Sequence, residues 1–180
     1  MFIGKQRISK MIKSLVNNII AKYNTTNPEI IAENEGIHIY YRNDFKELLG
    51  VYTIINDIDC IFINSNLDEN LIKQVIAHEL GHYFLHRNFA KNNILHDYGF
   101  YDISGKVEYE ANIFAAELLI PDNILEEYIH SNYTIDEIAS DIYTLPQLLY
   151  IKLNELKKTG KNISIPYIPY GNFLSKIRAT

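Results

Sequence analysis

Cysteine is almost absent from this chain of 180 residues, which contains a single one, Cys60. One cysteine excludes an intramolecular disulfide framework and any cysteine-rich metal site. Cys60 lies in the apolar run Ile58–Ile63, and a thiol in such surroundings is typically a buried structural group rather than a reactive one. We therefore predict that Cys60 packs in the core.

An excess of basic charge is also missing. The 17 lysines and arginines are outnumbered by 22 aspartates and glutamates, so the net charge is −5. Nucleic-acid-binding proteins draw much of their affinity from basic side chains against phosphate, which disfavours direct contact with nucleic acid. No run reaches the roughly 18 apolar residues of a membrane span, and Lys13 and Ser14 interrupt the apolar residues near the N-terminus. We expect a cytoplasmic protein with no membrane partner.

The segments that are present predict an α+β fold. Ile8–Ile20 has the periodicity of an amphipathic helix, docked on the core or, as the alternative, lying on a membrane surface. Three short runs rich in β-branched and aromatic residues then predict a small, mostly antiparallel, three-stranded sheet: Ile37–Tyr41, Gly50–Ile55 and Ile58–Ile63. A buried central helix follows from Asp68, then a polar loop over 88–105, another helix over Lys106–Leu119, and further helices up to Gly160. We expect one domain over 1–160 and an extended tail over 161–180.

The central predicted helix carries the pattern His-Glu-x-x-His, from His78 to His82. Residues four apart lie on one face of a helix, so two imidazoles can converge on one metal ion. Glu79 is rotated by about 100° from His78 and can act on a water molecule without being a ligand. The plainer alternative is a pair of histidines that hydrogen-bond in the core. Because buried histidines and carboxylates are costly without a metal or hydrogen bonds, we favour a metal site.

A catalytic zinc site needs a third protein ligand and leaves a fourth position to water. Glu108 is the best candidate, and Asn112, four residues later, can hold an imidazole N–H from the same helix face. Glu110 is the alternative ligand. His86, which follows the motif by one turn, is expected to be a residue that supports a ligand or packs beside it.

These residues give the chain a resemblance to the ImmA/IrrE family of metallopeptidases. It rests on Ala77–His82 with Leu85-His86 behind it, and on the block Glu108–Pro121, where Ile120 stands in place of the family's usual methionine. The resemblance covers about residues 10 to 155 and implies a zincin-like fold with one zinc ion on His78, His82 and Glu108. It also implies a catalytic Glu79 and, for the compact ImmA type of phages and mobile elements, cleavage of a helix-turn-helix repressor.

In the expected reaction Glu79 is the general base, and the substrate lies extended along a sheet edge. Candidate donors to the oxyanion are Tyr98, Tyr101 and His96. One alternative is a regulatory module that binds a repressor or antitoxin without cutting it, its zinc closed by a fourth protein ligand such as His86 or His96. The other is a DNA-binding helix-turn-helix over Thr134–Glu155, although its second helix is mostly apolar.

Overall fold

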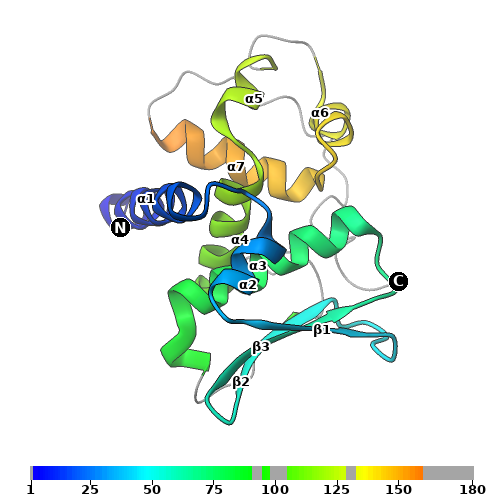
Figure 1. Cartoon of the computed structure of the whole chain (residues 1–180). Coiled ribbons are helices and arrows are strands. Elements are labelled where there is room, and N and C mark those ends of the chain that lie inside the picture. Colours follow the sequence, from blue (N-terminus) through cyan, green and yellow to red (C-terminus); the bar gives the residue numbers. More distant parts are fainter. Residues whose placement is uncertain (1, 91–94, 98–104, 129–132, 160–180) are drawn as a thin grey trace.

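We describe a computed structural model of the chain, over residues 2–90, 95–97, 105–128 and 133–159. Its elements follow in chain order: α1 (Phe2–Tyr23), α2 (Pro28–Asn34), β1 (His38–Arg42), β2 (Gly50–Ile55), β3 (Ile58–Asn64), α3 (Glu69–Ala90), β4 (Leu95–Asp97), α4 (Lys106–Leu119), α5 (Asp122–Glu126), α6 (Ile135–Asp141) and α7 (Pro146–Lys158). The sheet lies at one end of the molecule with α3 along it, and α4 runs from α3 toward α7 (Figure 1). The predicted α+β fold with a helical C-terminal part is confirmed. The predicted tail over 161–180 lies outside the described residues.

The sheet contains the three predicted strands and one more, in the order β1-β3-β2-β4. β2 pairs antiparallel with β3 and β4, whereas β1 runs parallel to β3. Asn56 and Asp57 both have positive φ, as the two central residues of a tight hairpin between β2 and β3 require. The predicted loop over 88–105 needs correction, because α3 continues to Ala90 and β4 lies within that range.

Local sequence signals fix where the helices begin. Asp68 Oδ1 accepts a hydrogen bond from Leu71 N at 2.9 Å, which caps α3. Thr134 and Glu137 form the reciprocal capping box at the start of α6 that their spacing predicts. Pro146 is the first residue of α7, where its missing N–H costs nothing.

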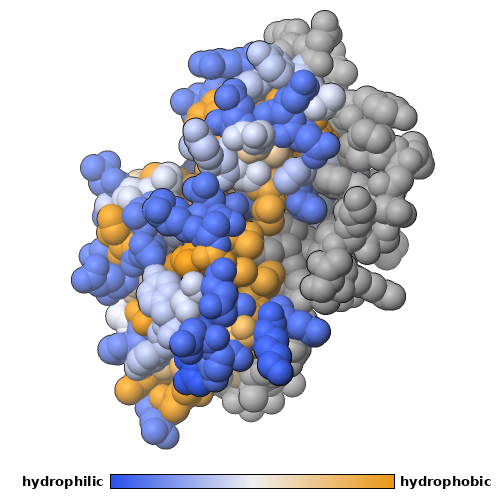
Figure 2. Space-filling model, turned by 90° about the vertical axis from the view of Figure 1, so that its right-hand side faces the viewer, coloured by the Kyte–Doolittle hydropathy of each residue, from blue (hydrophilic) through white to orange (hydrophobic). Residues whose placement is uncertain are grey.

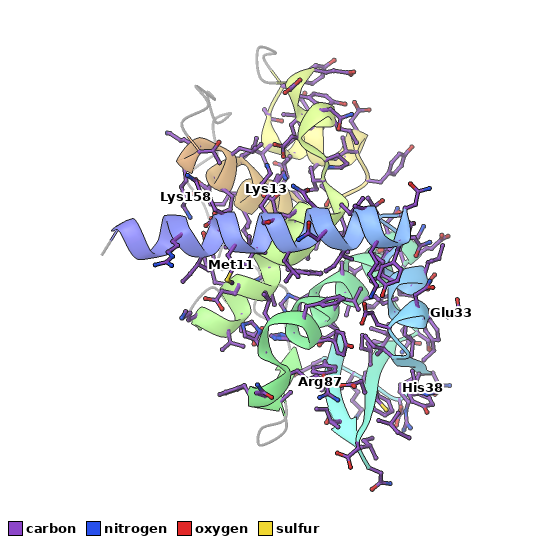
Figure 3. The ribbon with its side chains drawn as sticks, turned by 60° about the vertical axis from the view of Figure 1, so that its left-hand side comes forward. Met11, Lys13, Glu33, His38, Arg87 and Lys158 are labelled. Carbon is purple, nitrogen blue, oxygen red and sulfur yellow. The ribbon has the colours of Figure 1, made fainter. Side chains whose placement is uncertain are left out.

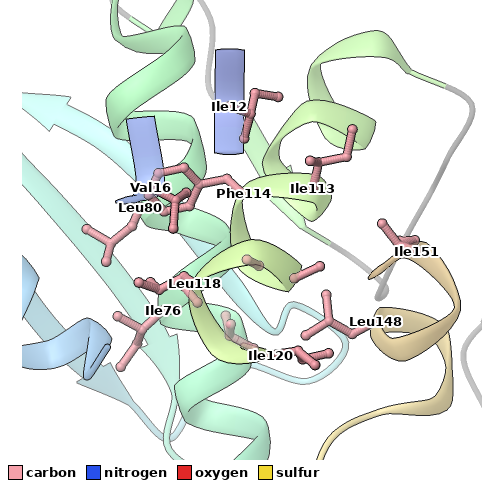
Figure 4. Close-up of a cluster of buried hydrophobic side chains, with 14 of the residues drawn as sticks. Ile12, Val16, Ile76, Leu80, Ile113, Phe114, Leu118, Ile120, Leu148 and Ile151 are labelled. Carbon is pink, nitrogen blue, oxygen red and sulfur yellow. The ribbon is translucent and has the colours of Figure 1, made fainter. Parts of the chain in front are cut away.

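The core is formed between α1, α3, α4 and α7 (Figure 4). Ile12 and Val16 of α1 are buried and Met11 is exposed, so the amphipathic helix is docked on the core, as predicted. Leu148, Leu149 and the other buried apolar residues of α7 lie in the same core. This packing fits a helical pair rather than a DNA-recognition helix.

The outer surface is mixed in character. On the face shown in Figure 2, hydrophilic residues predominate and hydrophobic ones form a short stretch through the middle. The large hydrophobic side chains that are exposed come from several elements, among them Met11 of α1, Tyr40 of β1 and Phe89 of α3. Among the described residues, no helix is both long and apolar enough to cross a membrane.

Candidate metal centre

The two motif histidines meet the predicted carboxylate at the crossing of α3 and α4. His78 Nε2 and His82 Nε2 are 3.0 Å apart, and Glu108 Oε2 lies 3.3 Å from the first and 3.4 Å from the second. His78 and His82 are buried, whereas the Glu108 side chain keeps 26% of its exposure. Within the part of the chain that is described, this is the only cluster of three or more potential ligands.

The spacing of these three atoms fits a small cation. Ligands about 2.0–2.1 Å from a tetrahedral zinc ion lie about 3.3 Å from one another. The distances among His78 Nε2, His82 Nε2 and Glu108 Oε2, which we call the ligand triangle, are close to this value. Two imidazole nitrogens at such a short distance repel each other unless a proton or a cation lies between them. The donor set, two nitrogens and one carboxylate oxygen, also suits zinc.

A close helix crossing brings the carboxylate to the histidines. A Cβ atom added to Gly81 of α3 would lie 2.8 Å from the Cα atom of Ala111 in α4. The backbones therefore approach as closely as they do only because residue 81 has no side chain. Glu108 and Asn112 flank Ala111 along α4, so this contact sets their distance from the motif.

Asn112 orients one of the histidines. His78 Nδ1 lies 2.8 Å from Asn112 Oδ1 and, with an amide oxygen opposite, acts as the donor. The tautomer with the proton on Nδ1 leaves the lone pair of Nε2 directed at Glu108 and His82. This is the supporting contact that the spacing of Glu108 and Asn112 predicts.

Burial keeps His82 neutral. It lowers the pKa of His82 to about 4, and the nearby His78 and His86 lower it further, although Glu108 opposes the shift. Burial alone would raise the pKa of Glu108, but its contacts with His78 and His82 hold that pKa below its usual value. At neutral pH the cluster therefore offers a neutral His82 and an ionised Glu108, which are the forms of these two residues that bind a metal ion.

Glu79 is fully buried on α3 beside strand β2. A Cβ atom added to Gly50 of β2 would lie 3.0 Å from Glu79 Oε1 and 2.4 Å from Val75 Cγ1. The missing side chain of Gly50 thus makes room for the Glu79 carboxylate between helix and sheet. The sequence places Glu79 next to His78 but gives no sign of this role for Gly50.

The other residues that the sequence singles out are not among the three converging side chains. His86 Nδ1 is 3.3 Å from His82 Nδ1, so His86 contacts a candidate ligand on the side away from Glu108. Glu110 Oε2 lies 3.0 Å from His86 Nε2 instead of joining the triangle. Tyr98 and Tyr101 fall outside the described residues, and for His96 only the backbone in β4 is described.

An α+β fold with a buried His-Glu-x-x-His helix and two histidines facing a carboxylate defines a candidate metalloenzyme. The model of the M78 peptidase family, described as the IrrE N-terminal-like domain, matches residues 32–158. Immunity region protein 2 of Bacillus phage phi105 is 36% identical over 148 residues, covering 82% of this chain and 92% of that protein. Metallopeptidase ImmA of Bacillus subtilis strain 168 is 35% identical over 121 residues, 66% of this chain and 69% of that protein.

The chain belongs to the ImmA/IrrE family of metallopeptidases, which confirms the resemblance found in its sequence. Membership implies a metal ion and a hydrolase that cleaves peptide bonds. His78, His82 and Glu108 are the residues whose geometry could hold that ion.

Proposed function

We propose that this protein is a zinc-dependent endopeptidase, gluzincin-like in its ligand set, that cleaves a helix-turn-helix transcriptional repressor of a phage or mobile element. The observation that carries the proposal is the triangle of His78, His82 and Glu108, with the buried Glu79 one residue from the first ligand. The relative from a phage immunity region supports the setting. A repressor substrate would also place the protein in the cytoplasm, without direct contact with nucleic acid or membrane.

In the proposed mechanism the chain's own residues hold and move protons around one zinc ion. When bound, zinc lowers the pKa of a water molecule and polarises the scissile carbonyl. His78, His82 and Glu108 would hold the ion, and Asn112 fixes the ring of His78. Glu79 would take the proton of the attacking water on its carboxylate and pass it to the departing amine nitrogen.

The substrate is proposed to bind as an added strand. β4 is an edge strand of the sheet and pairs with β2, whose Gly50 lies beside Glu79. An extended peptide that pairs with this edge would run past the triangle, with its main chain held by ladder hydrogen bonds.

The direct test is cleavage of a purified helix-turn-helix repressor from the same genetic element. Wild-type protein loaded with one zinc ion per chain should give two fragments, whose masses identify the cleaved bond. His78→Ala and Glu108→Ala should lose both the zinc and the cleavage. Loss of zinc in His78→Ala alone would move the third ligand to another residue, such as Glu110.

The alternative function is a regulatory module that binds its repressor or antitoxin without cutting it. Such a module would co-elute with the intact repressor at a fixed ratio, whether or not zinc is present. A stable complex with no fragments, formed by the zinc-loaded protein, would favour this alternative over the endopeptidase.

A further inference from the structure

A chain of polar contacts leads from His82, on the side away from the triangle, back to α4. His82 Nδ1 lies 3.3 Å from His86 Nδ1, and His86 Nε2 lies 3.0 Å from Glu110 Oε2. The His86 and Glu110 side chains keep only 8% and 15% of their exposure. With so little access to solvent, the contacts between these groups decide where their protons sit.

Only one proton arrangement along this chain lets His82 bind a metal ion through Nε2. His82 must then carry its proton on Nδ1 and donate it to His86 Nδ1. His86 in turn must be bare on Nδ1 and carry its own proton on Nε2. An ionised carboxylate accepts hydrogen bonds and donates none, so Glu110 selects this tautomer of His86.

We infer that His86 and Glu110 are positioning residues of the metal centre, which act in series to fix the tautomer and ring orientation of His82. The inference rests on the proposed metal site. Without Glu110, His86 is free to place its proton on Nδ1, facing His82. His82 Nδ1 must then be bare to accept that hydrogen bond, so the proton of His82 moves to Nε2. There it blocks the position that would bind the metal ion.

The two candidate histidine ligands are thus oriented in different ways by the same helix. Asn112 of α4 contacts His78 directly, whereas Glu110 reaches His82 only through His86. Partners behind a metal-bound histidine raise its basicity and hold its ring, and their loss typically weakens metal binding by about 10- to 100-fold.

A simpler explanation is that Glu110 strengthens metal binding only through its negative charge. Its second carboxylate oxygen lies 3.6 Å from Nζ of Lys106, whose side chain is 75% exposed. The charge explanation predicts an effect of Glu110 that is independent of His86. If Glu110 acts only through His86, its effect on zinc affinity should disappear once residue 86 can no longer accept a hydrogen bond from His82.

The experiment measures zinc affinity by competition with a chelator for His86→Phe, Glu110→Ala and the double variant. Each single change should weaken zinc binding about 10- to 100-fold, and the double variant should be no weaker than His86→Phe. The visible absorption of the Co²⁺-loaded protein should change in both single variants, because the ring of His82 turns. Glu69→Ala, an exposed glutamate at the start of α3, is the control and should match wild type.

Glu110→Gln guards against a folding defect, because it keeps the shape and its amide oxygen can still accept from His86 Nε2. Its zinc affinity should stay within a few-fold of that of the wild type and well above that of Glu110→Ala. Zinc affinity within twofold of wild type in both single variants, or effects that multiply in the double variant, would overturn the inference. Absence of zinc from the wild-type protein would instead overturn the proposed function.

Discussion

Carboxylates lie at both ends of α4, but they meet different partners. At the C-terminal end, Lys152 Nζ lies 2.6 Å from Glu117 Oε2 and 2.8 Å from Asp122 Oδ1. Lys13 Nζ of α1 lies 2.6 Å from Asp122 Oδ2, and Figure 3 shows α1 crossing the helices on this side. Two ammonium groups thus face two carboxylates, and the charges cancel. We call these four residues the ion-pair cluster.

At the N-terminal end Glu108 faces the imidazoles of His78 and His82, and among the described residues its ion-pair contacts include no lysine or arginine. The difference shows how the net charge of a polar cluster distinguishes a structural cluster from a metal site. A cluster that is neutral in itself is complete and structural, whereas converging lone pairs with a net negative charge require a cation. Variants at each end of α4 test this contrast.

Glu79→Gln should separate catalysis from metal binding at the candidate metal centre. Removal of a general base typically costs about 10²- to 10⁴-fold in rate, so kcat for repressor cleavage should fall by that factor. Zinc content should stay at one ion per chain, because Glu79 is not one of the three converging ligands. Glu69→Gln, on the exposed first turn of the same helix, is the matched control. Full turnover by zinc-loaded Glu79→Gln would contradict the mechanism.

Lys152→Ala should break the ion-pair cluster and leave Glu117 buried without its closest cation. Loss of one partner from a buried ion pair costs about 3–5 kcal/mol, which urea unfolding would measure as a lower free energy of unfolding. Zinc affinity under native conditions should stay unchanged, because this cluster lies at the far end of α4.

Lys157→Ala provides the control on the same helix, since Lys157 is exposed. It should change the free energy of unfolding by no more than about 0.5 kcal/mol. A loss of less than about 1 kcal/mol in Lys152→Ala, or a clear loss of zinc affinity, would mean that the two clusters are not the separate units described here.

Much of this architecture can be predicted from residues that are close together in the sequence. The bounds of α4, Lys106–Leu119, follow from Gly105 and Pro121, and the His-Glu-x-x-His spacing predicts which two histidines converge. Glu108 and Asn112 are four residues apart, so the sequence also predicts that they lie on the same face of α4. These features depend only on residues a few positions apart.

The features that sequence analysis missed depend on distant segments. β4 has three residues, too few for a periodic signal, and the parallel pairing of β1 with β3 is set by topology. The sequence predicts Glu110 as an alternative ligand, but its place beside His86 depends on how α3 and α4 cross. That crossing depends on contacts at Gly81 and Gly50, where a sequence shows only a missing side chain.

The two ends of α4 should also respond to acid in different pH ranges. The pKa of His82 is about 4 when folded, against 6.5 for the unperturbed group. Between these values the unfolded chain takes up a proton that the folded chain does not, so stability falls as the pH falls. The loss in metal-free protein should reach at most about 3 kcal/mol.

The ion-pair cluster should respond only in stronger acid. Burial alone would raise the pKa of Asp122, but hydrogen bonds from Lys13 and Lys152 hold it below 3.8. Its stabilising contribution is therefore present above pH 3.8 and lost as the pH falls through the lower, folded value. Urea unfolding across a pH series should show two steps, the upper one absent in His82→Asn and the lower one reduced in Asp122→Asn. A single step unaffected by His82→Asn would contradict this assignment.

Gly81→Ala should lower stability least of these variants, because it acts only on the spacing of α3 and α4. The added Cβ would lie 2.8 Å from Ala111 Cα and 3.0 Å from its carbonyl oxygen. Neither backbone atom can turn aside, so α3 and α4 must separate at a cost of about 1–3 kcal/mol. Alanine's better helix propensity recovers about 1 kcal/mol of this. Glu108 then moves away from His78, and zinc affinity should fall with the stability.

Gly36→Ala provides the matched control, since the same methyl group is added where nothing lies within 4 Å. Its cost comes from the backbone alone, because φ is +74° there and a left-handed residue with a side chain costs about 1–2 kcal/mol. The two variants should therefore lose similar stability, but only Gly81→Ala should lose zinc affinity. Equal zinc affinity in both would show that the helix crossing does not set the ligand triangle, and that Glu108 reaches the histidines by its own flexibility.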